Sequence, residues 1–565
     1  MKRISLLFYI SLLISISAQA QVQYDTLSVK QIGDGIFHYS IEAPAVPWTL
    51  EVVEVDLTKS STSIETAKAN DRLAAYEKPS SMALRNSYEN HEVIAAINGD
   101  FYSGGVPIHT QIIQGEILKM PFSGREMFGY SDLGNMLIEK TTYDGKLYIN
   151  GDEFSISDIN GARDADELVY YNHYKGASTG TNQYGIDVSM KAIDAWTVNG
   201  QVRAVVVEKS TAGDMQLNDS LFVLSGHGNS KTLLDSVAIG DTLIVEHKLA
   251  PGTDRMVEAI GGSKKFLNNG VIDGNWPERH PRSAIGFNAD TTKFYLVTVD
   301  GRQTISAGMT LTELGSFMKD IGAHIELNLE GGGSTGMVVH NKIVNSPSDG
   351  AGERAVANAL MIVSNKPKIG VLHNLNLSPT FDKVYRNESI EFKISGSDEN
   401  YYPLELTLEN ATFSVSEGFD ATIDDAGVFK AGNSVDTGYV YVEYAGITDT
   451  AEVIIKGITE MELFPKSTVT DSRNTITFYT KASDFDNVPQ TISLSDIDWE
   501  VTNASVGEVV DGVFSGFEDG QTKVVATYDG ISDTVEVEVQ IQTGTEEIDS
   551  FEDVSSWTMS GKNID

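Results

Sequence analysis

Hydrophobic and polar residues alternate along residues 323–329, which predicts a β-strand. The side chains of a strand point alternately to its two sides, so Ala323, Ile325, Leu327 and Leu329 share one face. The opposite face carries His324, Glu326, Asn328 and Glu330, and it runs directly into three glycines, a serine and a threonine. Glycines let a backbone approach a ligand closely and present its N–H groups to an anion. The pattern favours the floor of a binding site, with a solvated edge and a flexible turn as the alternative.

A helix is predicted directly before this strand. Thr310 and Glu313 have capping-box spacing, an apolar stripe runs from Leu311 to Ile321, and Gly322 ends the helix. Residues 72–90 are partly helical in spacing, and Pro79 is expected to interrupt any helix there. Further strands are expected over residues 49–57, 92–98, 111–118, 133–139, 202–208, 242–247, 293–299 and 338–343.

The chain is long enough for several domains, and five segments are predicted. Residues 1–20 have the charged, apolar and small-residue order of a secretory signal peptide. Residues 21–366 form a strand-rich mixed α/β catalytic domain. A motif at residues 427–450 recurs about 84 residues later, which indicates two tandem immunoglobulin-like β-sandwiches over residues 367–457 and 458–545. Residues 546–565 are expected to open a further, truncated domain. The fold class is therefore α+β, followed by two all-β sandwiches.

Composition narrows the function further. The 80 acidic and 41 basic residues give a net charge of −39, which argues against nucleic acid as a partner because phosphate neutralisation needs a basic patch. There are no cysteines, which excludes disulfides, zinc–thiolate sites and cysteine nucleophiles. No apolar run after the leader is long enough for a membrane span. Acidic loops could hold calcium, although no ligand spacing demands a metal.

Polar residues also follow the strand at residues 92–98, in the run Asn98-Gly99-Asp100-Phe101. This run is either a hairpin turn or part of a site. Glu326 and Glu330 lie about 13 Å apart along their strand, too far for a retaining carboxylate pair. Glu330 is therefore expected to work with Asp100, Asp300 or Glu353. Glu326 is expected to be structural, bound to an arginine such as Arg302 or Arg354.

Five motifs occur together in one order. They are Asn98-Gly99-Asp100-Phe101, the run from Pro281 to Gly286, Asp300-Gly301-Arg302, the Glu330 glycine loop, and the run from Ser346 to Ala359. Together they resemble the phosphodiester glycosidase family over roughly residues 45–365. The sequence departs from the family where the glycine loop begins, with Glu330 in place of the usual Asp. It departs again at residues 107–110, where the family usually has a glycine.

The resemblance implies hydrolysis of a sugar-1-phosphodiester at the sugar–oxygen bond, on a glycan or sugar-phosphodiester substrate. Glu330 and Asp100 are the candidates for general base or nucleophile. Arg282, Arg302 and Arg354 are the candidates for a phosphate clamp. The backbone of Gly331, Gly332 and Gly333 and the hydroxyls of Ser334 and Thr335 would assist the clamp. Asn98 and Asn328 would bind sugar hydroxyls. The alternatives are an ordinary glycosidase in the same pocket and a non-catalytic carbohydrate-binding surface protein.

Overall fold

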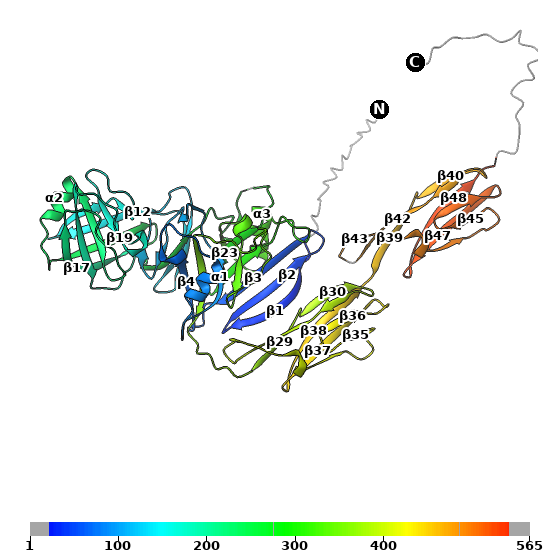
Figure 1. Ribbon diagram of the computed structural model, residues 1–565. Coiled ribbons are helices and arrows are strands. Elements are labelled where there is room, and N and C mark those ends of the chain that lie inside the picture. The colour runs from blue at the N-terminus through cyan, green and yellow to red at the C-terminus, as the bar shows by residue number, and fades with distance from the viewer. Residues whose placement is uncertain (1–21, 275, 485, 542–565) are drawn as a thin grey trace, which may run out of the picture. The chain divides into compact units, whose positions relative to one another are not determined.

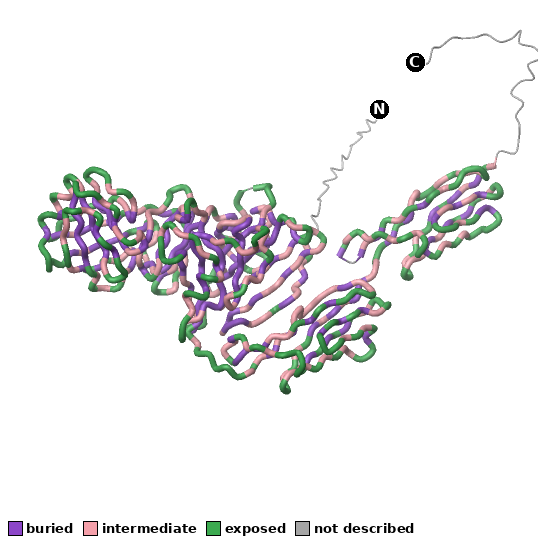
Figure 2. Tube along the Cα trace, viewed as in Figure 1, coloured by how far each residue is buried: buried purple, intermediate pink, exposed green. Residues whose placement is uncertain are grey.

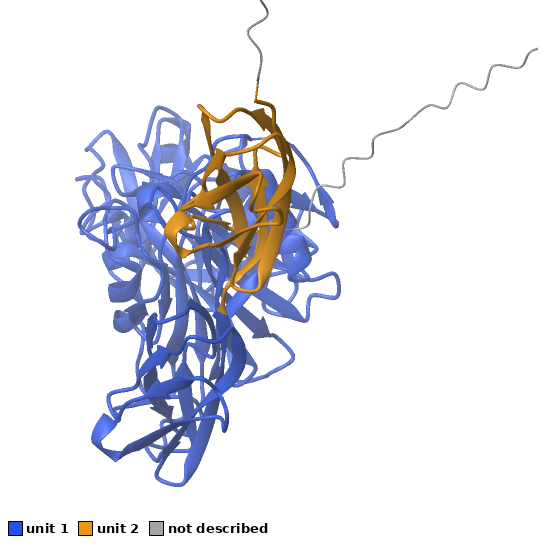
Figure 3. Cartoon of the chain, turned by 90° about the vertical axis from the view of Figure 1, so that its right-hand side faces the viewer, with its two compact units in different colours: residues 1–455 blue, residues 456–565 orange. Residues whose placement is uncertain are grey.

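A computed structural model describes residues 22–274, 276–484 and 486–541. The expected signal peptide and truncated final domain lie outside the described residues. Strands make up 51% and helices 8% of the structure, so the fold is mostly β, as Figure 1 shows. The chain divides into two compact units, residues 1–455 and 456–565, coloured separately in Figure 3. The helices of the described residues are α1 (Pro79–Arg85), α2 (Asn229–Asp235) and α3 (Leu311–Asp320).

Two sheets form the centre of the first unit. The six-stranded sheet has the order β1 (Asp25–Gly33), β2 (Ile36–Ala43), β3 (Trp48–Asp56), β24 (Lys293–Val299), β23 (Arg282–Phe287) and β25 (Ile325–Asn328). The five-stranded sheet has the order β27 (Lys342–Ile343), β26 (Met337–Val339), β5 (Glu92–Asn98), β28 (Asn358–Ser364) and β4 (Thr62–Lys68).

The two sheets pack face to face, with a helix on each outer side. Residues that alternate along β24 divide between two cores: Phe294 and Leu296 join the core between the sheets, whereas Tyr295 and Val297 join the core under α3. On the outer face of the five-stranded sheet, Met82 of α1 joins a third core. Both faces of each sheet are therefore covered, and Figure 2 shows the central strands as largely buried. Apolar burial of this kind is the main source of stability in such a fold.

A third sheet leads into an inserted subdomain. Its order is β11 (Met136–Glu139), β10 (Met127–Ser131), β20 (Met256–Gly261), β8 (Ile112–Ile113) and β9 (Glu116–Ile117). Between β11 and β20 the chain builds an eight-stranded sheet, whose core includes Ile112, Met127 and Ala259 of the third sheet. The order of that sheet is β13 (Asp152–Ile156), β12 (Thr142–Ile149), β19 (Thr242–Ala250), β17 (Gly200–Ser210), β16 (Gly185–Ala192), β18 (Phe222–His227), β15 (Leu168–Tyr171) and β14 (Asp158–Ile159).

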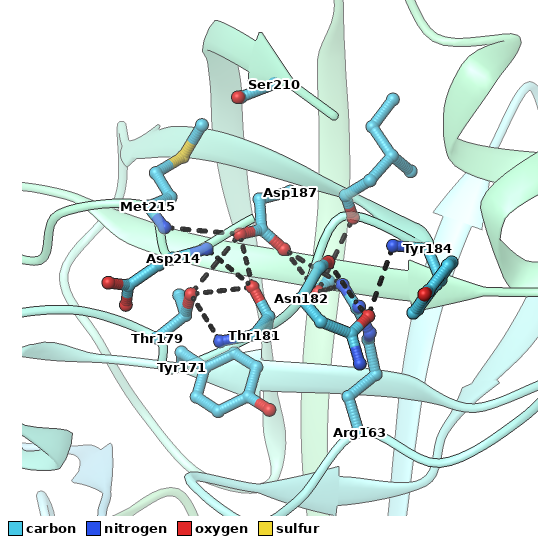
Figure 4. A network of polar contacts seen from close by, with 12 residues as sticks. Arg163, Tyr171, Thr179, Thr181, Asn182, Tyr184, Asp187, Ser210, Asp214 and Met215 are labelled. Carbon is cyan, nitrogen blue, oxygen red and sulfur yellow. Dashed lines mark hydrogen bonds and ion pairs between the residues drawn. The ribbon is translucent and has the colours of Figure 1, made fainter. Parts of the chain in front are cut away.

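A buried carboxylate, Asp187 of β16, ties loops to this inserted sheet (Figure 4). It forms an ion pair of 3.3 Å with the buried guanidinium group of Arg163. The hydroxyls of Thr179 and Thr181 and the N–H group of Met215 also donate to it, at 3.2, 2.7 and 3.3 Å. Because the charge is fully enclosed and paired, losing either member of the ion pair would leave an uncompensated buried charge.

After residue 366 the chain forms two β regions with matching strand arrangements. In the first, the sheets are β29 (Asn374–Ser378), β32 (Lys393–Ser397), β33 (Pro403–Leu404); β30 (Phe381–Tyr385), β38 (Ile447–Lys456), β37 (Asp436–Tyr444), β34 (Ala411–Val415); and β31 (Ser389–Glu391), β36 (Val428–Ala431), β35 (Ala421–Ile423). In the second, they are β39 (Ile458–Phe464), β42 (Tyr479–Asp484), β43 (Pro489–Gln490); β40 (Ser467–Thr470), β48 (Ile531–Val539), β47 (Gly520–Tyr528), β44 (Asp498–Val501); and β41 (Thr475–Thr477), β46 (Val513–Gly516), β45 (Gly507–Val510). The repeated motif lies in corresponding strands, whereas the immunoglobulin-like class and the domain limits stay predictions.

Several local predictions can be compared with these elements. The helix before β25 is confirmed, with both bonds of its capping box present. Pro79 does not interrupt a helix but begins α1, where its missing N–H is no loss. The expected single strands at residues 111–118 and 338–343 are each a short hairpin, β8–β9 and β26–β27. The polar face of the 323–329 segment is largely buried rather than solvated: Glu326 and Asn328 both lie in the interior.

Candidate functional site

The glycine loop that follows β25 is held in place by the buried side chain of Asn98. Its Nδ2 donates to the Glu330 carbonyl at 2.6 Å. Its Oδ1 accepts from the Ser283 hydroxyl at 2.6 Å and from the Gly336 N–H at 3.0 Å. Asn98 thus joins the end of β5 to β23 and to both sides of the loop. The Asn98–Phe101 run is therefore not a hairpin turn, and its asparagine is engaged with the chain rather than directed at a sugar.

Two guanidinium groups lie against the loop because glycines leave room for them. A Cβ atom added to Gly333 would lie 2.2 Å from Nη2 of Arg354, and one added to Gly332 would lie 3.2 Å from Nη2 of Arg302. Gly332 also has a φ of +65°, a conformation that side chains rarely tolerate. Both arginine residues are exposed, so their charges face solvent beside the loop.

Three backbone N–H groups of the loop form hydrogen bonds within the protein. Gly332, Ser334 and Thr335 donate to the carbonyls of Pro281, Gly331 and Gly332 at 2.9, 3.3 and 3.3 Å. The bonds of Ser334 and Thr335 close a short 3₁₀ turn over Gly332–Ser334. The Gly332 N–H is therefore engaged within the protein, whereas the anion-binding role of the Gly331 and Gly333 N–H groups stays a prediction.

The hydroxyl groups after the glycines differ in their surroundings. The Ser334 hydroxyl lies 3.2 Å from the Tyr102 hydroxyl and accepts from Nη1 of Arg354 at 3.3 Å. The Thr335 hydroxyl is buried and has no hydrogen-bond partner within the described residues. Ser334 is thus the hydroxyl that connects the loop to its neighbours.

Glu330 is a half-buried carboxyl group at the start of the loop. Its N–H donates to the Gly99 carbonyl at 3.0 Å, so its backbone lies beside that of Asp100. Burial raises the pKa of Glu330 to about 7, against the lowering effect of the Ser334 bond and of Arg354 and Arg125. Both protonation states are consequently populated near neutral pH, as a general acid or base requires.

Asp100 is buried, with only 1% of its surface exposed. Its Oδ2 accepts from the His109 N–H at 2.6 Å, while its Oδ1 has no partner in the described part of the chain. Burial raises the pKa of Asp100 to about 7, opposed by the His109 bond and by Arg125. Asp100 and Glu330 therefore share one cationic neighbour, Arg125.

Arg125 and Tyr102 are site residues that the sequence analysis missed. The Arg125 guanidinium lies 4.3 Å from the centre of the Phe101 ring, and its Nη1 is buried with no partner among the described residues. Arg125 lies in a loop without a motif, so no sequence signal marked it. Tyr102 directly follows the Asn98–Phe101 run, and its position there was the available signal.

Two of the predicted carboxylates have structural hydrogen bonds instead of a place at the loop. Asp300 accepts from Nδ2 of Asn345 at 2.9 Å and from the Ser346 N–H at 3.0 and 3.1 Å. Glu353 accepts from the N–H and hydroxyl of Ser80 at 2.7 and 2.5 Å, at the first turn of α1. The geometry therefore favours Asp100, and not Asp300 or Glu353, as the carboxyl neighbour of Glu330.

Arg282 and Asn328 are likewise engaged within the protein. Arg282 donates to the carbonyls of Met309 and Glu278 at 3.1 and 2.8 Å, and burial lowers its pKa to about 10. Nδ2 of Asn328 donates to the Ser263 hydroxyl and to the Leu329 carbonyl at 2.8 and 2.9 Å. Both side chains therefore form hydrogen bonds that hold segments next to the loop in place.

Glu326 is structural, as expected, but its predicted arginine partner is wrong. Its Oε2 accepts from the N–H groups of Phe266 and Leu267 at 3.0 and 3.1 Å. The reason is the direction of its side chain, which enters the packed interior beneath α3 and β21 (Leu267–Asn268) rather than reaching the exposed arginines.

The structure thus brings together a glycine-loop site, which we define as Asp100, Tyr102, Arg125, Arg302, Glu330, the Gly331–Ser334 turn and Arg354. In residues 22–541, except for residues 275 and 485, no group of three His, Asp or Glu side chains is arranged to hold a metal ion. The acidic loops named as calcium candidates offer no such group there. No helix in the described part of the chain is long and apolar enough to cross a membrane.

Comparison with known proteins gives one family and several partial likenesses. Residues 195–363 match the phosphodiester glycosidase family model. A segment of 84 residues is 42% identical to the SPbeta prophage-derived uncharacterized protein YomE of Bacillus subtilis, and it covers 15% of this chain and 13% of that protein.

Two solved structures share parts of the chain at low similarity. A hypothetical protein from Synechocystis is 18% identical, with a TM-score of 0.45 over 58% of this chain and 62% of that one. The catalytic domain of zebrafish N-acetylglucosamine-1-phosphodiester alpha-N-acetylglucosaminidase, auto-inhibited by its pro-peptide, is 15% identical, with a TM-score of 0.30 over 61% of this chain and 84% of that one.

The family match begins within the inserted subdomain, so Asn98 and Asp100 lie outside it, whereas Glu330, the glycine turn, Arg302 and Arg354 lie inside it. Residues 195–363 therefore carry the sequence pattern of the phosphodiester glycosidases, and the resemblance predicted from the motifs is confirmed for that part of the chain.

Proposed function

We propose that this chain is an exported hydrolase that cleaves the sugar–oxygen bond of a glycosyl-1-phosphodiester. The observation that carries the proposal is Glu330: a half-buried carboxyl group with a pKa of about 7, beside a turn that holds two exposed guanidinium groups. A carboxyl group able to exchange a proton suits the sugar half of such a substrate, and the cations suit its phosphate half. The family match over residues 195–363 supports the same reaction class.

Arg302 and Arg354 are the residues that we assign to the phosphate. Arg302 forms no ion pair with a carboxylate of the described chain, and its Nη2 lies 3.2 Å from Nδ1 of His280. Arg354 is oriented by Asp349, which accepts from its Nε at 2.7 Å and leaves its terminal nitrogens at the turn. A planar guanidinium group binds two phosphate oxygens at once, which a point charge does not. The predicted third member, Arg282, would act indirectly by supporting the loop.

The proposed reaction needs little acid assistance, because a phosphate monoester is a good leaving group. The oxygen of a water molecule attacks the anomeric carbon, Glu330 accepts the proton of that water, and the bond from carbon to the phosphate oxygen breaks. The electron pair of that bond leaves with the phosphate monoester, whose charge the two arginines neutralise. Arg125, whose charge lowers the pKa of both Asp100 and Glu330, would stabilise the carboxylate form in which Glu330 acts as base.

Two other functions fit parts of the site. An ordinary glycosidase would use the same carboxyl groups without needing Arg302 or Arg354. A non-catalytic carbohydrate-binding protein would keep the loop and lose turnover, with Glu330 in place of the family's usual Asp as the reason. Export itself rests on the signal-peptide pattern of residues 1–20.

The test uses the full mature chain with a panel of sugar-1-phosphodiesters and a panel of p-nitrophenyl glycosides. We expect turnover of at least one phosphodiester, and a loss of about 100-fold or more in kcat for Glu330→Gln. The matched control is Glu391→Gln, an exposed carboxylate in the first β region with a 3.9 Å contact to Lys393, which should leave the rate unchanged.

The panels separate the three functions. Turnover of glycosides but not of phosphodiesters would favour an ordinary glycosidase. Binding of a glycan without turnover on either panel would favour the non-catalytic protein. A Glu330→Gln variant as active as the parent would refute the assignment of Glu330.

A further inference from the structure

An exposed aromatic side chain, Tyr76, lies next to the glycine-loop site. Its side chain is 48% exposed, and its ring packs edge-on against Tyr102 with the ring centres 5.5 Å apart. Tyr102 in turn places its hydroxyl 3.2 Å from that of Ser334. Tyr102 therefore connects Tyr76 to the turn. Tyr76 adds one further aromatic ring to the site.

The backbone beneath Tyr76 is fixed, although its ring is in solvent. Its carbonyl accepts from Nδ2 of Asn70 at 3.1 Å. The next residue, Glu77, exchanges both backbone hydrogen bonds with Val356 of the segment leading into β28. The Glu77 carboxylate also accepts from the Asn70 N–H at 2.7 Å and from Nε of Arg85 at 3.2 Å. With its backbone fixed and its ring packed against Tyr102, Tyr76 loses little conformational freedom when a ligand packs on it.

Several tyrosines of the described residues are exposed, and Tyr76 differs from them in its contact with Tyr102 of the glycine-loop site. The C–H groups on one side of a pyranose ring form an apolar face that matches an aromatic ring, while its hydroxyls remain solvated. A sugar is the ligand whose chemistry fits both the ring and its continuity with the glycine-loop site.

We propose that Tyr76 is a stacking platform for an additional sugar unit, beyond the groups that flank the bond to be cleaved, so that the site takes an extended glycan chain. This inference rests on the proposed function, since it assigns part of the substrate of that same site. It makes Tyr76 a specificity residue, acting on how long a substrate is bound and not on the reacting atoms.

The test compares a short and a long substrate. The short one is the methyl phosphodiester of N-acetylglucosamine-1-phosphate, and the long one is the same diester extended by an oligosaccharide. Tyr76→Ala is expected to lower kcat/KM for the long substrate about tenfold, through KM, and to leave the short one unchanged. Tyr76→Phe keeps the ring and should stay within about twofold of the parent on both.

Tyr88→Ala is the matched control. Tyr88 is also exposed and also stacked on a neighbouring ring, that of His91 at 4.3 Å. It lies before the first residue of β5, whereas Asn98 ends that strand, so the two are about 20 Å apart along it. Tyr88→Ala should therefore change neither substrate.

The outcomes distinguish this inference from the proposed function. If Tyr76→Ala weakens both substrates equally, Tyr76 merely supports Tyr102 and the inference is overturned. If the parent turns over neither substrate, the proposed function fails, and calorimetric binding of the oligosaccharide decides the inference: about tenfold weaker binding by Tyr76→Ala supports it. Equal binding by both proteins, or no binding by the parent, overturns it.

Discussion

Glu326→Gln is the substitution whose effect on stability the structure defines most closely. Burial raises the pKa of Glu326 from 4.5 to about 8, although two backbone N–H groups donate to its Oε2. Glutamine keeps an oxygen for those two donors and cannot ionise. The other carboxylate oxygen, Oε1, has no partner within the described residues, so the amide nitrogen that replaces it breaks no existing bond.

The magnitude follows from linkage between proton binding and folding. A carboxyl group whose pKa is raised in the folded state stabilises the protein fully below its unfolded pKa, and that stability is lost as the pH rises through the folded pKa. For a rise from 4.5 to about 8, the loss between pH 5 and pH 9 is on the order of 4 kcal/mol. Glu258, also buried with a pKa raised to about 8, adds a similar slope that the variant retains.

The assay is calorimetric melting of the parent and the variant at several pH values, following the transition of the first unit. At pH 5 the two proteins should melt within a few degrees of each other. At pH 9 the variant should be the more stable, because it has no buried charge to create. Parallel profiles over this range would refute the reasoning, since they would mean that Glu326 ionises in the fold at no cost.

Three other predictions concern the site and the inserted subdomain. Gly333→Ala should displace the Arg354 guanidinium, because the new Cβ would lie 2.2 Å from it. The variant should lower kcat/KM for a phosphodiester about tenfold and leave the melting temperature unchanged. The control Gly350→Ala, whose Cβ would meet nothing within 4 Å, should change neither quantity. With Glu330 as base, kcat should rise with pH and level off above a pKa of about 7, and a rate that falls over this range would instead make Glu330 the acid. Asp187→Asn should lower the free energy of unfolding by about 3–5 kcal/mol in denaturant, because it leaves Arg163 without its ion-pair partner. The control Asp235→Asn, in an exposed ion pair with Lys231, should lower it by less than about 1 kcal/mol. Similar losses in both variants would count against the Asp187 network.

Local signals in the sequence were sufficient for the elements that depend on neighbouring residues. The α3 helix carries its own cap, stripe and stop, and the strand after it follows from strict alternation. The signal was ambiguous at Pro79, because a proline both breaks a helix interior and favours a first turn. Alternation of polar and apolar residues also cannot distinguish a solvated polar face from a buried one. The sequence therefore does not show that Glu326 points away from the exposed arginines.

The candidate site was predictable where its residues lie in motifs and unpredictable where contacts cross the fold. Glu330, Asp100 and Arg354 stand in motifs and come together around the turn. Asp300 and Glu353 stand in equally polar motifs, and only the positions of Asn345 and Ser80 show that their oxygens are occupied. Arg125 shows the opposite case, since its importance comes entirely from two carboxyl groups distant in sequence.

The attachment of the eight-stranded insert has a consequence for how this protein can vary. Its first and last strands, β12 and β19, are antiparallel neighbours, with Thr142 opposite Ala250. Opposed residues in such a ladder are about 5 Å apart, so the chain enters and leaves the insert at one place, while the insert also packs on the third sheet through a shared core. Strands on the side of the insert away from the third sheet can therefore be enlarged or trimmed in evolution while the two central layers, and the turn between their strands, keep their geometry.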